Sequence, residues 1–248
     1  MLPCVSDHRT REWQRAGRPI RSQPVARENP GMDAFLVDPT TTRDISNLLL
    51  DSAGRLRVVP ASALHATTAR ERFMFGVRHG VYNLPTEELC ASLHHRIAGR
   101  RAIEIGAGNG VLAETLGIPA TDSRLQEEPG IVAYYRAIRQ PTVPYGAHVE
   151  KLDAAAAIAK YRPQVVIGSW ITQLADPRHP HKGGSARGVD EEQIVASCDE
   201  YICIGNDLVH QHKSIWALPH EKITPPWLFS RAVNGTPDFI AFWTRPSP

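Results

Sequence analysis

The sequence of 248 residues predicts an α/β three-layer sandwich built on a mostly parallel sheet. Short apolar runs with the composition of buried strands alternate with amphipathic helical stretches, as in successive β–α–β units. Near the C-terminus this alternation stops. Two apolar stretches, residues 226–231 and 238–244, flank an Asn-Gly turn signal at Asn234 and Gly235. We therefore expect the sheet to close with an antiparallel hairpin made of these two stretches.

The bulk composition is that of an ordinary globular protein. Hydrophobic residues make up 42% of the chain, charged residues 22%, and the net charge is +2, so a core can be buried and no strong attraction to nucleic acid or a membrane is expected. The four cysteines lie far apart without CxxC spacing, which indicates reduced thiols. No apolar run reaches the roughly 18 residues that a membrane span needs. We therefore expect a cytoplasmic protein.

The N-terminal part is expected to consist of two segments. Residues 1–31 carry six arginines among Pro, Gly, Ser and Gln, without an apolar period or the apolar core of a signal peptide. This composition predicts a disordered basic tail. Met32 follows directly, so the tail could be an upstream extension of a domain that starts there. Residues 32–98 are expected to form a helical extension and lid, with short helices at 45–50 and 67–77.

A further helix begins after Thr86 and leads into the main domain, which we place at residues 99–248. Thr86 is a suitable N-cap, and apolar residues recur at four-residue spacing up to Ile97, so this helix should pack on the sheet. His94 and His95 are adjacent and therefore point to different helix faces. We expect them to complement the dipole of the helix end rather than to bind a metal.

The stretch 101–116, RAIEIGAGNGVLAETL, is the strongest functional signal. An apolar run ending at Ile105 predicts a buried parallel strand, the glycines at 106–110 predict a turn, and a helical pattern begins at Val111. Glycines let the backbone approach a ligand closely, and a helix N-terminus presents unpaired N–H groups. Glu104 lies inside the strand, where a carboxylate is costly to bury unless something polar binds it. We therefore expect Glu104 to contact a ligand.

Strands and helices alternate after the glycine turn. Asp122 and Asp153 each follow a predicted strand, and ligands of open α/β sheets bind at the carboxyl ends of strands. The expected elements are a second strand closed by residues 121–123, a helix at 131–138, a strand at 145–152, a helix at 154–161, a buried strand at 163–170, a helix at 191–198 and a strand at 201–205.

The pattern ExGxGxG at residues 104–110 resembles the cofactor motif of class I S-adenosylmethionine-dependent methyltransferases. The resemblance covers about residues 80–245 and is greatest to an uncharacterised bacterial branch with the blocks IEIGAGNG, IPATDS, VVIGSW and IGND. It implies a Rossmann-like three-layer sandwich with a seven-stranded sheet, S-adenosyl-L-methionine as the cofactor, and methyl transfer as the activity. In that family an acid after the second strand binds the ribose and one after the third binds the adenine amino group. Asp122 and Asp153 match these positions.

The resemblance also implies a set of cofactor-binding residues. The cofactor is cationic at sulfur and carries an α-amino group, so carboxylates around a glycine-lined pocket suit its charge. Tyr82 and Asn83 precede the motif strand by about twenty residues, where this fold commonly folds a lid over the cofactor. Trp170 could stack on the adenine or on an aromatic acceptor, or belong to the core. The expected cofactor-binding residues are Tyr82, Glu104, Gly106, Ala107, Gly108, Gly110, Asp122, Ser123, Asp153, Ala154, Ser169 and Trp170.

Two alternatives to a methyltransferase remain open. An NAD-binding oxidoreductase needs the fingerprint GxGxxG and a pyrophosphate over the helix N-terminus. This chain has GxGxG, and the acid at Glu104 would repel a pyrophosphate but attract an amino group. The second alternative is a catalytically inactive module that binds S-adenosylmethionine, because the sequence contains no recognisable catalytic motif.

The acceptor is expected to be a small molecule. Residues 169–172, Ser-Trp-Ile-Thr, stand where enzymes that methylate amino groups of DNA and proteins carry Asn/Asp-Pro-Pro-Tyr, which argues against adenine or cytosine as the acceptor. The chain also has no strong basic face for nucleic acid. Asp207, His210 and His181 are candidate catalytic residues on loops after later strands, and the alternative is that they are ordinary loop residues. No metal is expected, because histidines two apart bind one only with further ligands.

Overall fold

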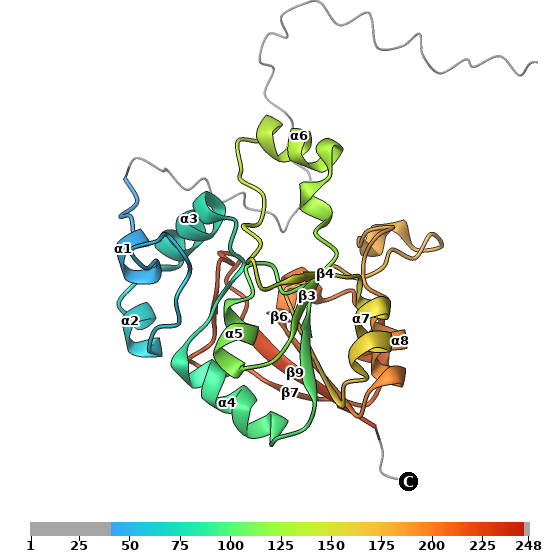
Figure 1. Ribbon diagram of the computed structural model, residues 1–248. Helices are drawn as coiled ribbons and strands as arrows, with labels where there is room; N and C mark the ends of the chain where they lie inside the picture. Colours follow the sequence, from blue (N-terminus) through green and yellow to red (C-terminus); the bar gives the residue numbers. More distant parts are fainter. Residues whose placement is uncertain (1–40, 246–248) are drawn as a thin grey trace, which may run out of the picture. The chain divides into compact units, whose positions relative to one another are not determined.

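A seven-stranded sheet organises the part of the chain that the computed structural model describes, residues 41–245. The strand order is β4-β3-β2-β5-β6-β9-β7. Neighbouring strands from β4 to β6 are parallel, whereas β9 runs antiparallel to both β6 and β7 (Figure 1). The strands are β2 (Ala102–Ile105), β3 (Ala120–Asp122), β4 (Glu150–Lys151), β5 (Val165–Ser169), β6 (Glu200–Asn206), β7 (Glu221–Ile223) and β9 (Asp238–Thr244).

The central strands are apolar because both of their faces are covered. Val165, Val166 and Ile167 of β5 are each 0% exposed, as expected for a parallel strand with helices on both sides. Successive residues of a strand point to opposite faces, so Ile167 packs in one core cluster and Val166 in another. This arrangement confirms the predicted α/β three-layer sandwich with a mostly parallel sheet.

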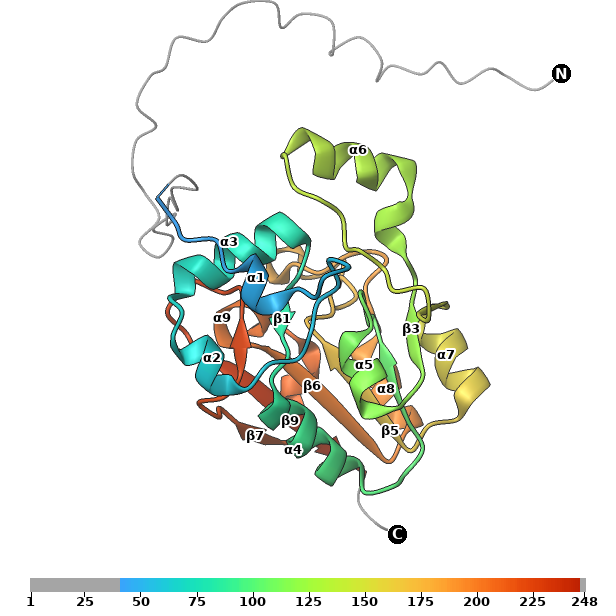
Figure 2. The same ribbon diagram turned by 60° about the vertical axis from the view of Figure 1, so that its left-hand side comes forward.

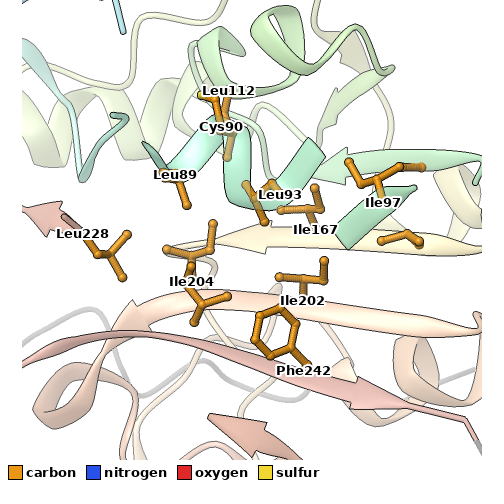
Figure 3. Close-up of a cluster of buried hydrophobic side chains, with 13 residues drawn as sticks. Leu89, Cys90, Leu93, Ile97, Leu112, Ile167, Ile202, Ile204, Leu228 and Phe242 are labelled. Carbon is orange, nitrogen blue, oxygen red and sulfur yellow. The ribbon is translucent and has the colours of Figure 1, made fainter. Parts of the chain in front are cut away.

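Helices α4 (Glu87–Ile97) and α5 (Val111–Leu116) cover one face of the sheet. Leu89, Leu93 and Ile97 of α4 pack against Ile167, Ile202, Ile204 and Phe242 of the strands (Figure 3). The Thr86 hydroxyl caps α4 by accepting the Leu89 N–H at 3.1 Å, and exposed histidines occupy its last turn. The predicted helix, its cap and its packing on the sheet are therefore confirmed.

Helices α7 (Ala154–Tyr161) and α8 (Glu191–Ser197) cover the opposite face, together with the short helix η3 (Ser214–Ala217). Their core contains aromatic residues: Trp243 and Tyr201 are almost completely buried, and the Trp243 Nε1–H donates to the Ile215 carbonyl at 2.9 Å. Such a partner is what a buried indole needs. The two faces together enclose the sheet as the middle layer (Figure 2).

The segment before the main sheet is helical and has its own small core. That core joins residues from 45 to 84 with Phe229 from far along the chain. The expected helix at 67–77 forms as α3, whose N-cap Thr68 makes a capping box with Glu71. The elements are α1 (Ser46–Leu49), α2 (Ala61–His65), α3 (Ala69–His79) and β1 (Asn83–Leu84), with β1 paired antiparallel to β8 (Phe229–Ser230).

The predicted C-terminal hairpin is wrong in one of its strands. Residues 238–244 form β9 as expected, but its partners are β6 and β7 (residues 221–223) rather than residues 226–231. Within 226–231, β8 leaves the main sheet and pairs with β1. The turn at Asn234 is held at the end of β6, because Asn234 Nδ2 donates a hydrogen bond to Asn206 Oδ1 at 2.8 Å.

The remaining short elements surround the carboxyl ends of the parallel strands. Their bounds are η1 (Leu125–Glu127), α6 (Pro129–Ala137), η2 (Pro180–Lys182) and α9 (Asp207–His210). In both views α6 stands clear of the sheet (Figures 1 and 2). The strand expected at 145–152 is much shorter, since only residues 150–151 pair with β3.

Several expectations concern regions that the structure does not test. The tail at 1–31 and a start at Met32 lie outside the described residues. Residues 41–245 all belong to one compact unit, and the division between residues 98 and 99 stays a prediction. Among the described cysteines, Cys90, Cys198 and Cys203 are buried and unpaired. No described helix is long and apolar enough to cross a membrane.

Candidate cofactor-binding site

A cavity of about 400 Å³ opens at the carboxyl ends of β2, β3 and β5. In a mostly parallel sheet these ends lie on the same edge, which is where ligands of open α/β sheets bind. The volume is in the range of small-molecule sites. The lining residues come from segments 80–85, 104–112, 122–126, 131–145, 169–172 and 185–189, together with Leu56.

The glycine turn forms one wall of the cavity in a conformation that requires glycine. Gly106, Gly108 and Gly110 have φ angles of 58°, 57° and 75°, in the left-handed region that side chains disfavour. A Cβ on Gly106 would also lie 2.6 Å from Ile171 Cγ2, and one on Gly110 would lie 2.6 Å from Val149 Cγ2. The turn therefore presents bare backbone to the cavity, with Ala107 lining it alongside Gly106 and Gly108.

Glu104 is a buried carboxylate at the base of this turn. Its side chain lines the cavity, the residue is 3% exposed, and Oε2 accepts the Ala113 N–H at 3.0 Å. Burial, with a smaller contribution from the nearby charge of Asp122, raises its pKa to about 8. No described cation pairs with Glu104, since its polar contact is a backbone N–H. A cationic ligand in the cavity would supply the missing charge and return this pKa toward its ordinary value.

Asp122 connects the end of β3 to the glycine turn. Its Oδ2 accepts the Gly108 N–H at 3.0 Å, and its Oδ1 accepts the Arg124 N–H at 2.7 Å. Burial raises the pKa of this carboxyl group despite both hydrogen bonds. Asp122 and the adjacent Ser123 line the cavity as expected. Two acids and a bare glycine turn therefore converge on the same end of it.

Asp153 and Ala154 lie outside the cavity lining. Asp153 is exposed and caps α7, with its Oδ1 accepting the Ala156 N–H at 2.8 Å, and neither residue lines the cavity. The expected position after the third strand is thus used for a helix cap. Gly110 is also outside the lining, because it faces His148 and Val149. These three residues are left out of the candidate site, although Gly110 shapes the turn.

Three buried polar atoms in cavity-lining residues have no hydrogen-bond partner among the described residues. They are Asn83 Oδ1, Ser169 Oγ and Trp170 Nε1. Buried polar atoms are nearly always paired, so a group of three in one place points to a ligand. Trp170 also has a φ of 57°. A bulky residue in the left-handed region is strained, and such strain concentrates at functional sites.

Tyr82 lines the cavity beside Trp170, and their ring centroids are 6.1 Å apart. The other contact of the Tyr82 ring is the Arg231 guanidinium, 3.6 Å from its centroid. The Tyr82 backbone is fixed as well, because its carbonyl accepts the Arg231 N–H at 3.0 Å. The predicted lid residues Tyr82 and Asn83 therefore lie at the cavity.

The three candidate catalytic residues do not line the cavity. His210 is buried behind Trp170, with ring centroids 5.2 Å apart, and burial lowers its pKa to about 4. Asp207 forms an ion pair with Lys222 at 2.6 Å. His181 is exposed in η2 and packs against His179. None of the three therefore lines the cavity, and their catalytic roles stay predictions. Within residues 41–245 no cluster of three or more metal-ligating side chains occurs.

Two parts of the lining were not expected from the sequence. One is the segment between β3 and β4, which contributes Ile131, Tyr134, Tyr135 and Tyr145. The other is the loop at 185–189, held near η1 and α6 by an ion pair between Arg187 and Glu128. Apolar residues at 131, 134, 135 and 138 have the spacing of one helix face. The sequence shows this spacing, but it does not show that this helix face lines the cavity.

Comparison with known proteins finds similarity in solved structures alone. No protein-family model matches the chain, and no curated protein sequence matches it. One similar solved structure is precorrin-6y C5,15-methyltransferase from Geobacter metallireducens, with 13% identity and a TM-score of 0.35 over 65% of this chain and 89% of that one.

Two further similar structures are also assigned as methyltransferases. One, complexed with SAH, has 8% identity and a TM-score of 0.34 over 62% of this chain and 48% of that one. The other, from Pyrococcus horikoshii and assigned as an RNA methyltransferase, has 16% identity and a TM-score of 0.30 over 63% of this chain and 80% of that one. The strand order of this chain, with the antiparallel β9 between β6 and β7, is that of a Rossmann-like three-layer sandwich with a mostly parallel seven-stranded sheet.

Proposed function

We propose that this protein is an S-adenosylmethionine-dependent methyltransferase that acts on a small-molecule acceptor. The observation that carries the proposal is the position of Glu104, a buried carboxylate beside a bare glycine turn and without a cationic partner among the described residues. Such a group attracts a cation and repels a phosphate. S-adenosylmethionine carries a sulfonium and an α-ammonium group, so its charge suits this position.

The residues present also fit the rest of this cofactor. The left-handed turn at Gly106 and Gly108 lines the cavity with backbone, which a ligand can approach closely. Asp122 lines the cavity beyond the turn, where the class I resemblance places the ribose hydroxyls. Glu104, the glycine turn and Asp122 would hold S-adenosylmethionine with its charged end toward Glu104. Tyr82 and Trp170 offer aromatic rings, and Ser169 offers an unpaired hydroxyl, to a methyl acceptor beside it.

The chain's contribution to the reaction would be positioning. When bound, S-adenosylmethionine supplies a methyl group on a positively charged sulfur. Transfer requires the acceptor atom in line with that carbon, and holding two reactants in this geometry accounts for much of the rate enhancement in such reactions. Among the described residues that line the cavity, Glu104 and Asp122 are the acids and both lie at the glycine turn. The lining also includes tyrosines, Trp170 and Arg187, which would contact the acceptor.

A second function is also compatible with the structure. The candidate bases His210 and His181 lie outside the cavity lining, which also suits a module that binds the cofactor without transferring its methyl group. An NAD-binding oxidoreductase is less compatible with the structure, because a pyrophosphate over the turn would lie next to the Glu104 carboxylate.

Binding and transfer can be tested separately. Calorimetry with S-adenosylmethionine and with NAD, in matched buffers, is expected to give saturable binding of the first and none of the second. Protein supplied with S-adenosylmethionine labelled in its methyl group should then label a compound of low molecular weight in a filtered cell extract. Binding without any labelled product would support the non-catalytic module, and binding of NAD alone would overturn the proposal.

A further inference from the structure

Helix α6 carries an apolar face that the core does not use. Ile131, Tyr134, Tyr135 and Ile138 recur at the i, i+3, i+4, i+7 spacing of one helix face. Such a face normally packs against the core. Here α6 has no fully buried residue, Tyr134 is 60% exposed and Ile138 is 42% exposed. The helix therefore presents an apolar surface that has not been covered by the rest of the described chain.

This surface faces the cavity. Ile131, Tyr134 and Tyr135 all line it, although α6 stands clear of the sheet (Figures 1 and 2). Two contacts join this segment to other parts of the chain: the hydroxyls of Tyr135 and Tyr82 are 3.4 Å apart, and Arg187 pairs with Glu128 just before the helix. The Val143 N–H donates to Gln126 Oε1 at 2.8 Å and so ties the two ends of the segment to each other.

Aromatic side chains from separate parts of the chain line the cavity. Tyr134 and Tyr135 belong to α6, whereas Tyr82 precedes β1 and Trp170 follows β5. One face of Tyr82 is occupied by Arg231, which fixes the ring and leaves it able to contact a ligand by its other surface. Aromatic groups prefer offset or edge-to-face contacts with other flat rings, so this lining favours a planar aromatic ligand over a saturated one.

Three residues of the lining, Asn83, Ser169 and Trp170, each carry a buried polar atom that would orient a ligand brought within reach of it. Trp170 Nε1–H is a donor, Asn83 Oδ1 is an acceptor and Ser169 Oγ can be either, and all three are buried without a partner among the described residues. An apolar ligand would leave these atoms unpaired, which disfavours its binding. A ring that carries a hydroxyl group can both donate to and accept from such atoms.

We propose that the segment from Leu125 to Val143 is an acceptor-binding cap and that it selects a planar aromatic acceptor bearing a hydroxyl group, held between Tyr134 and Tyr135 of α6 and the wall formed by Tyr82 and Trp170. This proposal rests on the proposed function, because it assigns the glycine-turn half of the cavity to the cofactor. It adds the class of acceptor and the element that recognises it.

The test uses two probes of equal size that differ in planarity. 2-Naphthol is flat and aromatic, whereas 2-decalol is its saturated, non-planar counterpart with the same hydroxyl. Each is titrated by calorimetry into the full-length protein saturated with S-adenosylhomocysteine, which occupies the cofactor half without allowing turnover. We expect 2-naphthol to bind at least tenfold more tightly than 2-decalol.

Variants of α6 locate the binding site. Tyr134→Ala and Tyr135→Ala are expected to weaken 2-naphthol binding by about three- to tenfold each, the range of aromatic pair contacts, with less than a twofold change in S-adenosylhomocysteine affinity. Arg136→Ala, at an exposed position outside the lining of the same helix, is the matched control and should leave both affinities unchanged. These variants should fold, because α6 contributes no fully buried residue.

The outcomes separate the two proposals. If S-adenosylhomocysteine binds but the two probes bind equally, or if the tyrosine variants bind 2-naphthol like the unaltered protein, the acceptor-binding cap is wrong and the proposed function stands. Absence of 2-naphthol binding at millimolar concentration to the S-adenosylhomocysteine complex has the same meaning. If S-adenosylhomocysteine does not bind, both proposals fail together.

Discussion

The Oε2 atom of Glu104 lies 3.0 Å from the backbone nitrogen of Ala113, in the first turns of α5. This hydrogen bond fixes one oxygen of a carboxylate that is otherwise buried in the cavity wall. It lowers the pKa of Glu104, yet burial outweighs it and the pKa stays raised, at about 8. Without a cationic partner, Glu104 therefore holds a proton at neutral pH, and a cationic ligand would displace this proton.

The affinity for S-adenosylmethionine should consequently rise with pH. A cation favours the ionised form of Glu104, so binding releases a proton below pH 8 and the affinity increases by up to about tenfold per pH unit between pH 6 and 8. Above pH 8 it should level off. Calorimetry in two buffers of different ionisation enthalpy measures the released proton. Glu104→Gln keeps the acceptor for Ala113 but should give a weaker affinity that does not change over this range.

Glu104 also makes the folding stability depend on pH. Its contribution to stability should fall as pH rises, whereas the affinity for S-adenosylmethionine should rise. An ordinary glutamate has a pKa of 4.5, whereas that of folded Glu104 is about 8. Between these values the folded state retains a proton that the unfolded state loses, so the contribution of Glu104 to stability falls as pH rises through this window. Urea unfolding of the protein and of Glu104→Gln isolates this contribution. A difference between them that grows with pH is expected, and a difference independent of pH would contradict the raised pKa.

Gly106→Ala should damage the ligand site, whereas Gly117→Ala should not. Both glycines have a positive φ, so each substitution is expected to cost about 1–2 kcal/mol of stability. At Gly106 the new Cβ would also meet Ile171 Cγ2 at 2.6 Å and force the turn or residue 171 to move. At Gly117 nothing lies within 4 Å. S-adenosylmethionine affinity, measured by calorimetry, should fall more than tenfold for Gly106→Ala and stay within twofold for Gly117→Ala.

The two aspartates that the sequence places after strands should behave differently. Asp122→Ala removes the acceptor of the Gly108 and Arg124 N–H groups and should weaken S-adenosylmethionine binding by about 1–3 kcal/mol, the cost of a charge-assisted hydrogen bond. Asp153→Ala removes a helix cap and should lower stability by about 1 kcal/mol while leaving affinity unchanged. A loss of affinity in Asp153→Ala would return this residue to the site.

A buried ion pair supports the loop that follows β5. Lys213 Nζ pairs with Glu191 and also donates to the Ile171 carbonyl at 3.1 Å, while the Tyr201 hydroxyl donates to Glu191 Oε1 at 2.7 Å. Lys213→Met leaves a buried carboxylate without its cation and should destabilise the protein by about 3–5 kcal/mol. Adding Glu191→Gln removes that charge and should restore part of the loss in urea unfolding. If the double variant is less stable than Lys213→Met, the account of this pair is wrong.

Local features of the sequence were sufficient to predict the strand, turn and helix around Glu104. The apolar run, the glycines and the helical spacing all lie within sixteen residues, so no distant contact was needed to interpret them. The same is true of Thr86, whose capping role depends on residues three positions away.

The errors arose where the outcome depends on distant segments. β8 was assigned to the C-terminal hairpin because it is apolar and precedes an Asn-Gly turn, but it pairs with β1, about 145 residues earlier in the chain. The true edge strand β7 is polar and exposed, with no strand-like pattern. Asp153 is an example at a single residue. An aspartate that binds a ligand after a strand and one that caps the next helix look identical in sequence.

The cavity was only partly predictable for the same reason. Glu104, Asp122 and Ser169 lie at or near the carboxyl ends of parallel strands that meet at one edge of the sheet, so their convergence follows from the parallel sheet. Tyr134 and Tyr135 reach the cavity through an inserted segment whose path no local pattern specifies. The sequence correctly predicts that His210 comes just after β6. It does not predict that the side chain packs behind Trp170 and outside the cavity lining.

The most direct test of a site for a cationic adenosyl ligand is calorimetry with S-adenosylmethionine at pH 8, comparing the full-length protein with Glu104→Gln. We predict saturable binding to one site in the unaltered protein and at least tenfold weaker binding in the variant. Equal affinities would contradict the role given to Glu104. Absence of binding at millimolar S-adenosylmethionine would contradict the proposed function itself.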